Sequence, residues 1–178
     1  QTEKRWKSKR RPSDYRQPDV QAHFRQTRVA FEVQLSTTFL NVVVGRREFY
    51  RGEKAMLIWI VRRFDPEDRR LTIDDLLFNN NSNILVVDNE TVRLSAEQSA
   101  FMARCWYREP YLEQGQVQHR WSNTLVKVRD MTFDVAGQRA FGFDVQGRTS
   151  ELFAELAKRA AAEHERRLDP ARAHFFSF

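Results

Sequence analysis

The sequence predicts an α+β fold in which antiparallel strands followed by a helix occur twice, over residues 29–108 and 116–168. Apolar and polar residues alternate from Val29 to Leu35, the pattern of a half-buried strand. Ser95 stands three residues before Gln98, a capping-box spacing that predicts the start of the first helix. Strands therefore precede a helix, and the same order returns later in the chain.

The first repeat is predicted to hold several strands before its helix. Expected strands cover residues 39–47 and 54–64, and residues 84–87 and 91–94 are expected to form a hairpin around Asp88-Asn89. Residues 71–78 fit a strand or a short helix equally well. The helix that begins at Ser95 is expected to end near Arg108, because Pro110 cannot continue it.

The second repeat is predicted to hold strands at residues 117–121, 124–134 and 139–145, with a turn at Ala136-Gly137. A long helix is expected from Thr149 or Ser150 to about Leu168. Its buried stripe comprises Leu152, Phe153, Leu156, Ala157, Ala160 and Ala161.

The two ends differ from this body. Residues 1–28 carry nine Lys or Arg and three Asp or Glu, whereas residues 29–178 carry 21 of each sign. This basic segment contains Pro12 and Pro18 and no periodicity, so it is predicted to be a disordered, extended arm suited to a polyanion. Residues 169–178 form an aromatic tail that is expected to pack on the body or on another subunit.

Several classes of site are not expected. A single cysteine, Cys105, excludes an intramolecular disulfide and a cysteine-based zinc site, and the four histidines have no metal-ligand spacing. No glycine-rich phosphate loop and no apolar run long enough for a membrane span is present. We therefore expect no metal, no cofactor, no membrane association and no enzymatic activity.

Arginines and lysines cluster at the predicted strand ends and on the exposed face of one strand. If antiparallel strands bring these ends together, they form a basic surface that binds RNA phosphates without reading sequence. The predicted RNA-binding residues are Arg46, Arg47, Arg51, Lys54, Arg62, Arg63, Arg69, Arg70, Arg120, Lys127, Arg129 and Arg139.

A metal-dependent nuclease is the catalytic alternative, because paired carboxylates bind Mg²⁺ beside a phosphate. Its candidate residues are Asp65, Asp68, Asp74, Asp75 and Glu90, with Lys54. Most of these acids also fit ordinary turn or helix-cap positions.

The strand-and-helix order, the basic segment and the stretch Tyr50-Arg51-Gly52-Glu53-Lys54-Ala55-Met56-Leu57 resemble the Whirly-type single-strand binders. That stretch is similar to their K-G-K-A-A-L signature at Arg51, Gly52, Ala55 and Met56, and departs from it at Glu53 and Lys54. The arginine-rich composition looks most like the mitochondrial guide-RNA-binding proteins of kinetoplastids.

This resemblance implies single-stranded RNA binding, with annealing of guide RNA to pre-mRNA in mitochondrial RNA editing. It also implies a mitochondrial location and a heterotetramer with a related subunit. A structural subunit of a mitochondrial ribonucleoprotein and a protein-only interaction module stay open beside it.

Overall fold

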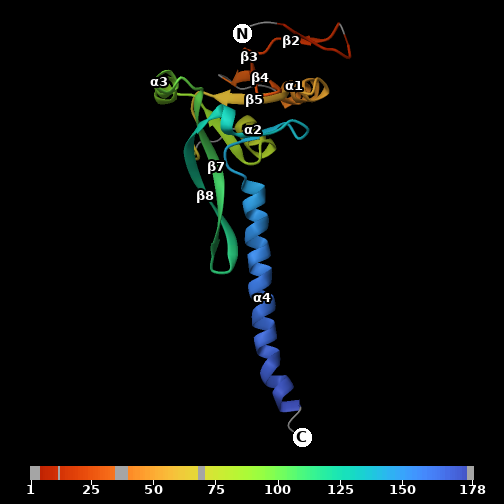
Figure 1. Ribbon diagram of the computed structural model, residues 1–178, viewed down its shortest axis with the longest axis vertical. Helices are drawn as coiled ribbons and strands as arrows, with labels where there is room; N and C mark the ends of the chain where they lie inside the picture. Colours follow the sequence, from red (N-terminus) through yellow and green to blue (C-terminus); the bar gives the residue numbers. More distant parts are fainter. Residues whose placement is uncertain (1–4, 12, 35–39, 68–70, 176–178) are drawn as a thin grey trace. The chain divides into compact units, whose positions relative to one another are not determined.

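The computed structural model describes residues 5–11, 13–34, 40–67 and 71–175. They fall into two compact units (Figure 1). The first unit comprises Gln1–Arg108 and Trp121–Asp144, and the second comprises Glu109–Arg120 and Val145–Phe178. The mixture of strands and helices confirms the predicted α+β class.

A six-stranded sheet with the order β3-β4-β5-β6-β7-β8 organises the fold. Its strands are β3 (Val20–Phe24), β4 (Thr27–Gln34), β5 (Met56–Val61), β6 (Asn83–Val86), β7 (Met102–Glu113) and β8 (Gln116–Lys127). Strands β3 and β4 are antiparallel, β4, β5 and β6 run parallel, and β6 and β7 are antiparallel. The sheet therefore has a parallel centre.

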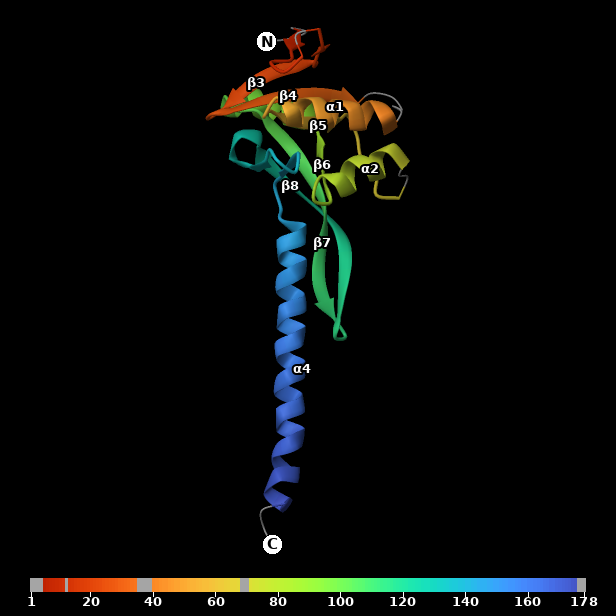
Figure 2. The same ribbon diagram turned by 90° about the vertical axis from the view of Figure 1, so that its right-hand side faces the viewer.

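Helices supply the crossovers that parallel strands require. Helix α1 (Leu40–Gly52) joins β4 to β5, and α2 (Leu71–Asn79) joins β5 to β6. Both views place α1 beside β5 (Figures 1 and 2). The buried residues of α1 are Val43, Phe49 and Tyr50, whose spacing puts them on one side of the helix.

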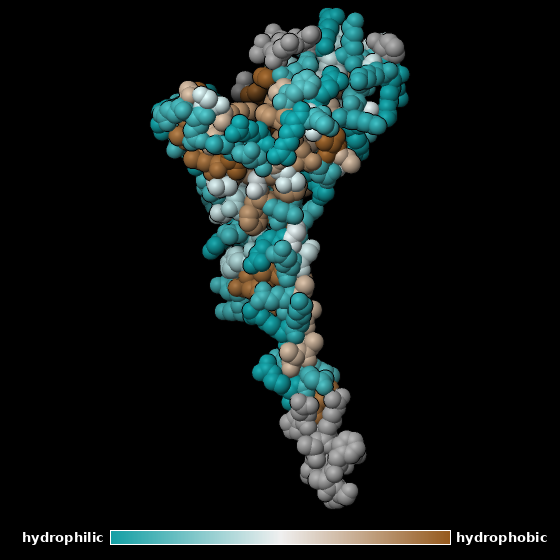
Figure 3. All heavy atoms as spheres, in the orientation of Figure 1, coloured by the Kyte–Doolittle hydropathy of each residue, from teal (hydrophilic) through white to brown (hydrophobic). Residues whose placement is uncertain are grey.

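Two apolar clusters hold the helices to the sheet. One contains Trp6, Ala30, Phe49, Tyr50, Ala55 and Leu57, and the other contains Val61, Leu77, Ile84 and Val86. The visible surface is mostly hydrophilic, with apolar side chains in small separate patches (Figure 3).

The turn between β7 and β8 has only two residues. Gln114 and Gly115 both have positive φ, 48° and 76°, as expected for the type I′ turns that suit the twist of a hairpin. Glycine adopts this backbone without the steric cost of a Cβ atom.

The remaining elements are short, except for the last helix. They are β1 (Trp6–Lys7) paired with β2 (Tyr15–Arg16), α3 (Asn89–Gln98), η1 (Val128–Asp130), β9 (Thr132–Asp134) paired with β10 (Arg139–Phe141), and α4 (Val145–Phe175). Among the described residues, no helix combines the length and apolar character needed to cross a membrane.

Several sequence predictions are confirmed, and others are wrong. Strands β4 and β5, the turn at Ala136-Gly137 and the long C-terminal helix lie where they are predicted. Residues 40–47 of the predicted strand 39–47 belong to helix α1, and Phe39 lies outside the described residues. A crossover between parallel strands overrides the strand preference of Val42–Val44.

The region around residue 95 also differs from the prediction. Asp88 accepts a hydrogen bond from the Thr91 amide at 2.8 Å and starts α3, so residues 84–94 do not form a hairpin. Ser95 lies inside α3, and the second half of the predicted helix 95–108 belongs to strand β7. Alternating burial at Ala103, Cys105 and Tyr107 is the period-two pattern of that strand.

The structure also differs from the predicted N-terminal arm and C-terminal tail. Residues 20–24 form β3 and pair with β4, and Trp6 is buried, so this part of the basic segment is folded. Helix α4 continues past Pro170 to Phe175, while Phe176–Phe178 lie outside the described residues. The predicted two-repeat arrangement is not confirmed, because α1 and α2 stand between strands of one sheet.

Candidate functional site

Two carboxylates lie near each other at one end of the β3–β4 hairpin. The strand register begins with Val20 opposite Phe31, and Asp19 directly precedes Val20. One oxygen of the Asp19 carboxylate accepts the Val33 amide at 2.7 Å, which holds this side chain against β4. The charge of Asp19 acts on Glu32, the residue before Val33, so the two acids are within electrostatic range of each other.

Glu32 is a buried acid in the middle of an apolar strand, with 4% of its surface exposed. Its carboxylate forms an ion pair with Arg46 of α1. The pKa of Glu32 is raised to about 7, mainly by burial; the charge of Arg46 opposes the rise and the charge of Asp19 adds to it. The fold therefore places a carboxylate where its ionised form is disfavoured.

Helix α1 contributes two further polar side chains near Glu32. Arg46 and Tyr50 are four residues apart and so lie on the same face of the helix. Burial raises the pKa of the Tyr50 phenol, and the negative charge of Glu32 adds to the effect. The phenol is therefore uncharged and lies within electrostatic range of Glu32.

Gln34 completes the row on β4. It lies two residues after Glu32, so its side chain is on the same face of the strand, and it is half-buried. Asp19, Glu32 and Gln34 together give two carboxylates and one amide at this end of the β3–β4 hairpin. We refer to these three residues as the hairpin site.

The burial of β4 differs from what alternation predicts. The alternation places Ala30, Glu32 and Gln34 on the solvent side, yet Ala30 and Glu32 are buried under α1. Val33, on the other face, is 39% exposed and borders an open groove. Burial on both faces of β4, with the assignment of residues 1–28 to an arm, explains why sequence reasoning missed Asp19 and Glu32.

Several of the predicted RNA-binding residues are engaged with carboxylates. Five of them form ion pairs with carboxylates: Arg46 with Glu32, Arg51 with Glu48, Arg120 with Glu109, Arg129 with Asp130 and Arg139 with Asp134. Lys54, Arg62 and Arg63 are exposed, and Lys127 is half-buried. Arg69 and Arg70 lie outside the described residues.

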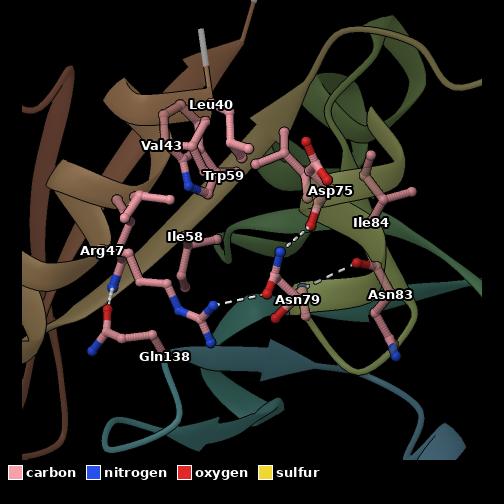
Figure 4. Close-up of a pocket in the computed structure, with 14 residues that line it drawn as sticks. Leu40, Val43, Arg47, Ile58, Trp59, Asp75, Asn79, Asn83, Ile84 and Gln138 are labelled. Atoms are coloured by element: carbon pink, nitrogen blue, oxygen red, sulfur yellow. Dashed lines mark hydrogen bonds between the residues drawn. The ribbon is translucent and has the colours of Figure 1, made fainter. Parts of the chain in front are cut away.

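Arg47 is engaged inside the protein. Its guanidinium donates to the Asn79 side-chain oxygen at 2.9 Å and to the Gly137 carbonyl at 2.7 Å. These contacts border a cavity of about 100 Å³ that is lined by α1, β5 and α2, with Trp59 and Asp75 among its lining residues (Figure 4). Burial lowers the pKa of Arg47, and its contacts are those of a structural residue.

The acids considered for a nuclease from sequence alone lie on separate elements. Asp65 accepts the Glu67 amide at 2.9 Å in a loop, Asp74 and Asp75 belong to α2, and Glu90 pairs with Arg104. Lys54 follows α1 with a positive φ of 52°, and Asp68 lies outside the described residues. Across the described ranges, no group of three or more His, Cys, Asp or Glu side chains is placed to hold a metal ion.

Comparison with known proteins gives one match. No curated protein and no solved structure is similar to the chain. Residues 8–146, more than half of the chain and including the whole hairpin site, match the family described as domain of unknown function DUF6035. The chain therefore belongs to the DUF6035 family.

Proposed function

We propose that this protein is a Mg²⁺-dependent hydrolase of phosphodiester bonds in nucleic acid, with the hairpin site as its catalytic centre. The observation that carries the proposal is the proximity of Asp19 and Glu32, since Asp19 accepts the Val33 amide and its charge acts on Glu32. The proposal retains the metal-dependent nuclease considered from the sequence, but assigns its catalytic centre to different residues.

The donor set fits Mg²⁺. This ion is typically held by one or two carboxylates and completes its shell with water and substrate phosphate, so two acids suffice. Burial is the main cause of the raised pKa of Glu32 and the charge of Asp19 adds to it, so a divalent cation there would favour the ionised carboxylate. Bound Mg²⁺ would supply charge neutralisation at the phosphate and a more acidic water.

The surrounding side chains have separate roles in this proposal. Asp19 and Glu32 would hold the cation, and Gln34 would orient a water through its amide. Arg46 neutralises Glu32 in the ion pair and, once a cation replaces it there, would be free to contact a phosphate oxygen. The amide of Gln34 cannot accept a proton from the attacking water, so another group must accept it.

Charge favours a polyanionic substrate. The segment that leads into the hairpin site carries an excess of six positive charges over residues 1–28. Phosphate contacts of this kind raise affinity for nucleic acid without selecting a sequence.

Guide-RNA annealing by a Whirly-type protein without a catalytic centre stays a prediction, as do the RNA-editing, mitochondrial and heterotetramer expectations. The geometry supports this function less, because many of the cations assigned to RNA are paired with carboxylates. A buried acid paired with a second acid also has no role in such a protein.

A cleavage assay tests the proposal. Labelled single- and double-stranded DNA and RNA are incubated with the purified chain in Mg²⁺ and, separately, in EDTA. We expect Mg²⁺-dependent cleavage that falls at least about 100-fold in Asp19→Asn and in Glu32→Gln. Glu90→Gln serves as the matched control, because it removes an exposed, arginine-paired carboxylate on α3, and its cleavage rate should equal the wild-type rate.

Two results would contradict the proposal. One is a wild-type chain that cleaves none of the four substrates while annealing complementary RNA strands, which would favour the annealing function. The other is cleavage that persists in both hairpin-site variants, which would move the catalytic centre elsewhere.

A further inference from the structure

A basic turn near the N-terminus is fixed to the body of the protein. Trp6 is buried, and its ring packs edge-on against Tyr50 with centroids 5.3 Å apart. The Arg28 guanidinium covers the same indole ring at 3.7 Å from its centroid. Strand β1 then pairs with β2, which closes the segment into a hairpin. Residues 6–11 and 13–16 are therefore part of the folded unit.

One buried carboxylate holds the turn at residues 8–11. Glu53, just after α1, accepts the Ser8 hydroxyl at 2.7 Å and the Lys9 amide at 3.1 Å and 3.0 Å through its two oxygens. The Ser8 oxygen in turn accepts the amides of Arg10 and Arg11 at 3.1 Å and 3.0 Å. Although burial opposes it, hydrogen bonding from the turn lowers the pKa of Glu53, so this carboxylate is ionised when it binds the turn.

The turn presents cations to solvent. Lys7, Lys9, Arg10 and Arg11 are exposed, and none of them forms an ion pair with a described carboxylate. This contrasts with Arg46 and Arg51 on α1, which are paired. Since Ser8 and Glu53 already bind the backbone amides, the side chains are what the turn offers to a partner.

The turn is continuous with the hairpin site. Arg16 lies opposite Trp6 in the β1–β2 register and places its guanidinium over the Phe49 ring at 5.1 Å. Its charge acts on Tyr50, which also feels the charges of Asp19 and Glu32. Only two residues separate Arg16 from Asp19 in the chain. A nucleic acid strand bound at the turn would therefore lie next to the carboxylates of Asp19 and Glu32.

We propose that residues 7–11 are a built surface for the phosphate backbone of nucleic acid, which delivers a strand to the hairpin site. This inference deepens the proposed function and rests on it. A merely solvated basic tail would not require a buried tryptophan and a buried carboxylate to fix its backbone. Lysine and arginine fixed in a turn bind phosphate with less loss of conformational freedom than the same residues in a disordered tail.

The test separates binding from cleavage by working in EDTA. Binding of 20-nucleotide single-stranded DNA, double-stranded DNA and single-stranded RNA is measured against salt concentration for the whole chain. The first variant combines Lys9→Ser, Arg10→Ser and Arg11→Ser. We expect at least a 10-fold loss of affinity at low salt and a salt slope smaller by about 2 to 3, since each lost phosphate contact removes about 0.7–0.9 from it.

Two further variants show whether location and fixation matter. Arg148→Ser, Arg159→Ser and Arg167→Ser on α4 remove the same net charge from paired, exposed positions and should change affinity less than twofold. Glu53→Ala removes the acceptor that fixes the turn. It makes the chain more positive, and we nevertheless expect weaker binding.

Equal losses in the two triple variants would overturn the proposal, because net charge alone would then explain binding. Tighter binding by Glu53→Ala would overturn the idea of a built turn. If the Lys9→Ser, Arg10→Ser, Arg11→Ser variant lost binding to anionic phosphatidylserine vesicles while its binding to nucleic acid was unchanged, the turn would be assigned to a membrane surface. Asp19→Asn should bind like wild type and cleave poorly, so failure of the catalytic proposal is distinguishable from failure of this one.

Discussion

Replacing Glu32 with glutamine should stabilise the protein at neutral pH while it abolishes cleavage. The folded protein raises the pKa of Glu32 from 4.5 to about 7. Below pH 4.5 the acid is protonated in both states. As the pH rises towards 7 the unfolded chain loses this proton first, so the folded state becomes less stable relative to it.

The size of the effect follows from the shift. A difference of about 2.5 pKa units corresponds to about 3 kcal/mol at about 1.4 kcal/mol per unit. Glu32→Gln lacks this penalty and keeps an oxygen that can accept from Arg46. The stability of the variant relative to wild type should therefore rise by about 3 kcal/mol between pH 4.5 and pH 8.

Urea unfolding followed by tryptophan fluorescence, in EDTA at both pH values, measures this difference. Glu48→Gln is the control, because that carboxylate is exposed and paired with Arg51 on the same helix. Its stability relative to wild type should change by less than about 0.5 kcal/mol. A Glu32→Gln curve that stays parallel to wild type over this pH range would refute the reasoning.

Three further predictions use the same unfolding assay or a thermal one. Trp6→Ala should lower the free energy of unfolding by about 3–5 kcal/mol, because it empties a buried aromatic site, and a loss below about 1 kcal/mol would mean that β1 does not contribute to the core. Asp88→Ala should cost about 1 kcal/mol by removing the cap of α3, whereas Asp88→Asn should cost less. Millimolar Mg²⁺ should raise the wild-type Tm and leave Asp19→Asn unchanged, and an equal rise in both would place the cation elsewhere.

Local patterns predicted the type of several elements. The alternation of Val29, Phe31 and Val33 predicted β4, and the apolar run from Met56 to Val61 predicted β5. The apolar spacing on the last helix predicted α4, but its stripe is not buried as expected: Leu152 is buried, whereas Phe153 is 58% exposed. The hydrophobic period therefore chose between helix and strand without fixing which side chains are buried.

Topology decided the elements that local patterns missed. The run Val42–Val44 favours a strand, but β4 and β5 are parallel neighbours and the chain between them must cross over. Residues 102–107 are a strand because they pair with β6 or continue that pairing. The local sequence alone does not reveal this partner, so it does not decide between helix and strand.

The candidate site depended on pairing that a single sequence does not reveal. Asp19 stands in a basic, proline-containing stretch that is typical of disorder, and only its contact with β4 brings it near Glu32. Glu32 alternates with apolar residues and so reads as a surface residue until α1 covers it. A lone acid within an apolar strand, close to a second acid that follows a proline, was the available signal.

Divalent-cation binding tests the central claim most directly. Titration of the metal-free protein with Mn²⁺ as a stand-in for Mg²⁺, followed by electron paramagnetic resonance, counts bound ions per chain. The hairpin site predicts at least one ion in wild type and Glu90→Gln, with that ion lost in Asp19→Asn and in Glu32→Gln. Equal Mn²⁺ binding by all four proteins, or none by any of them, would contradict it.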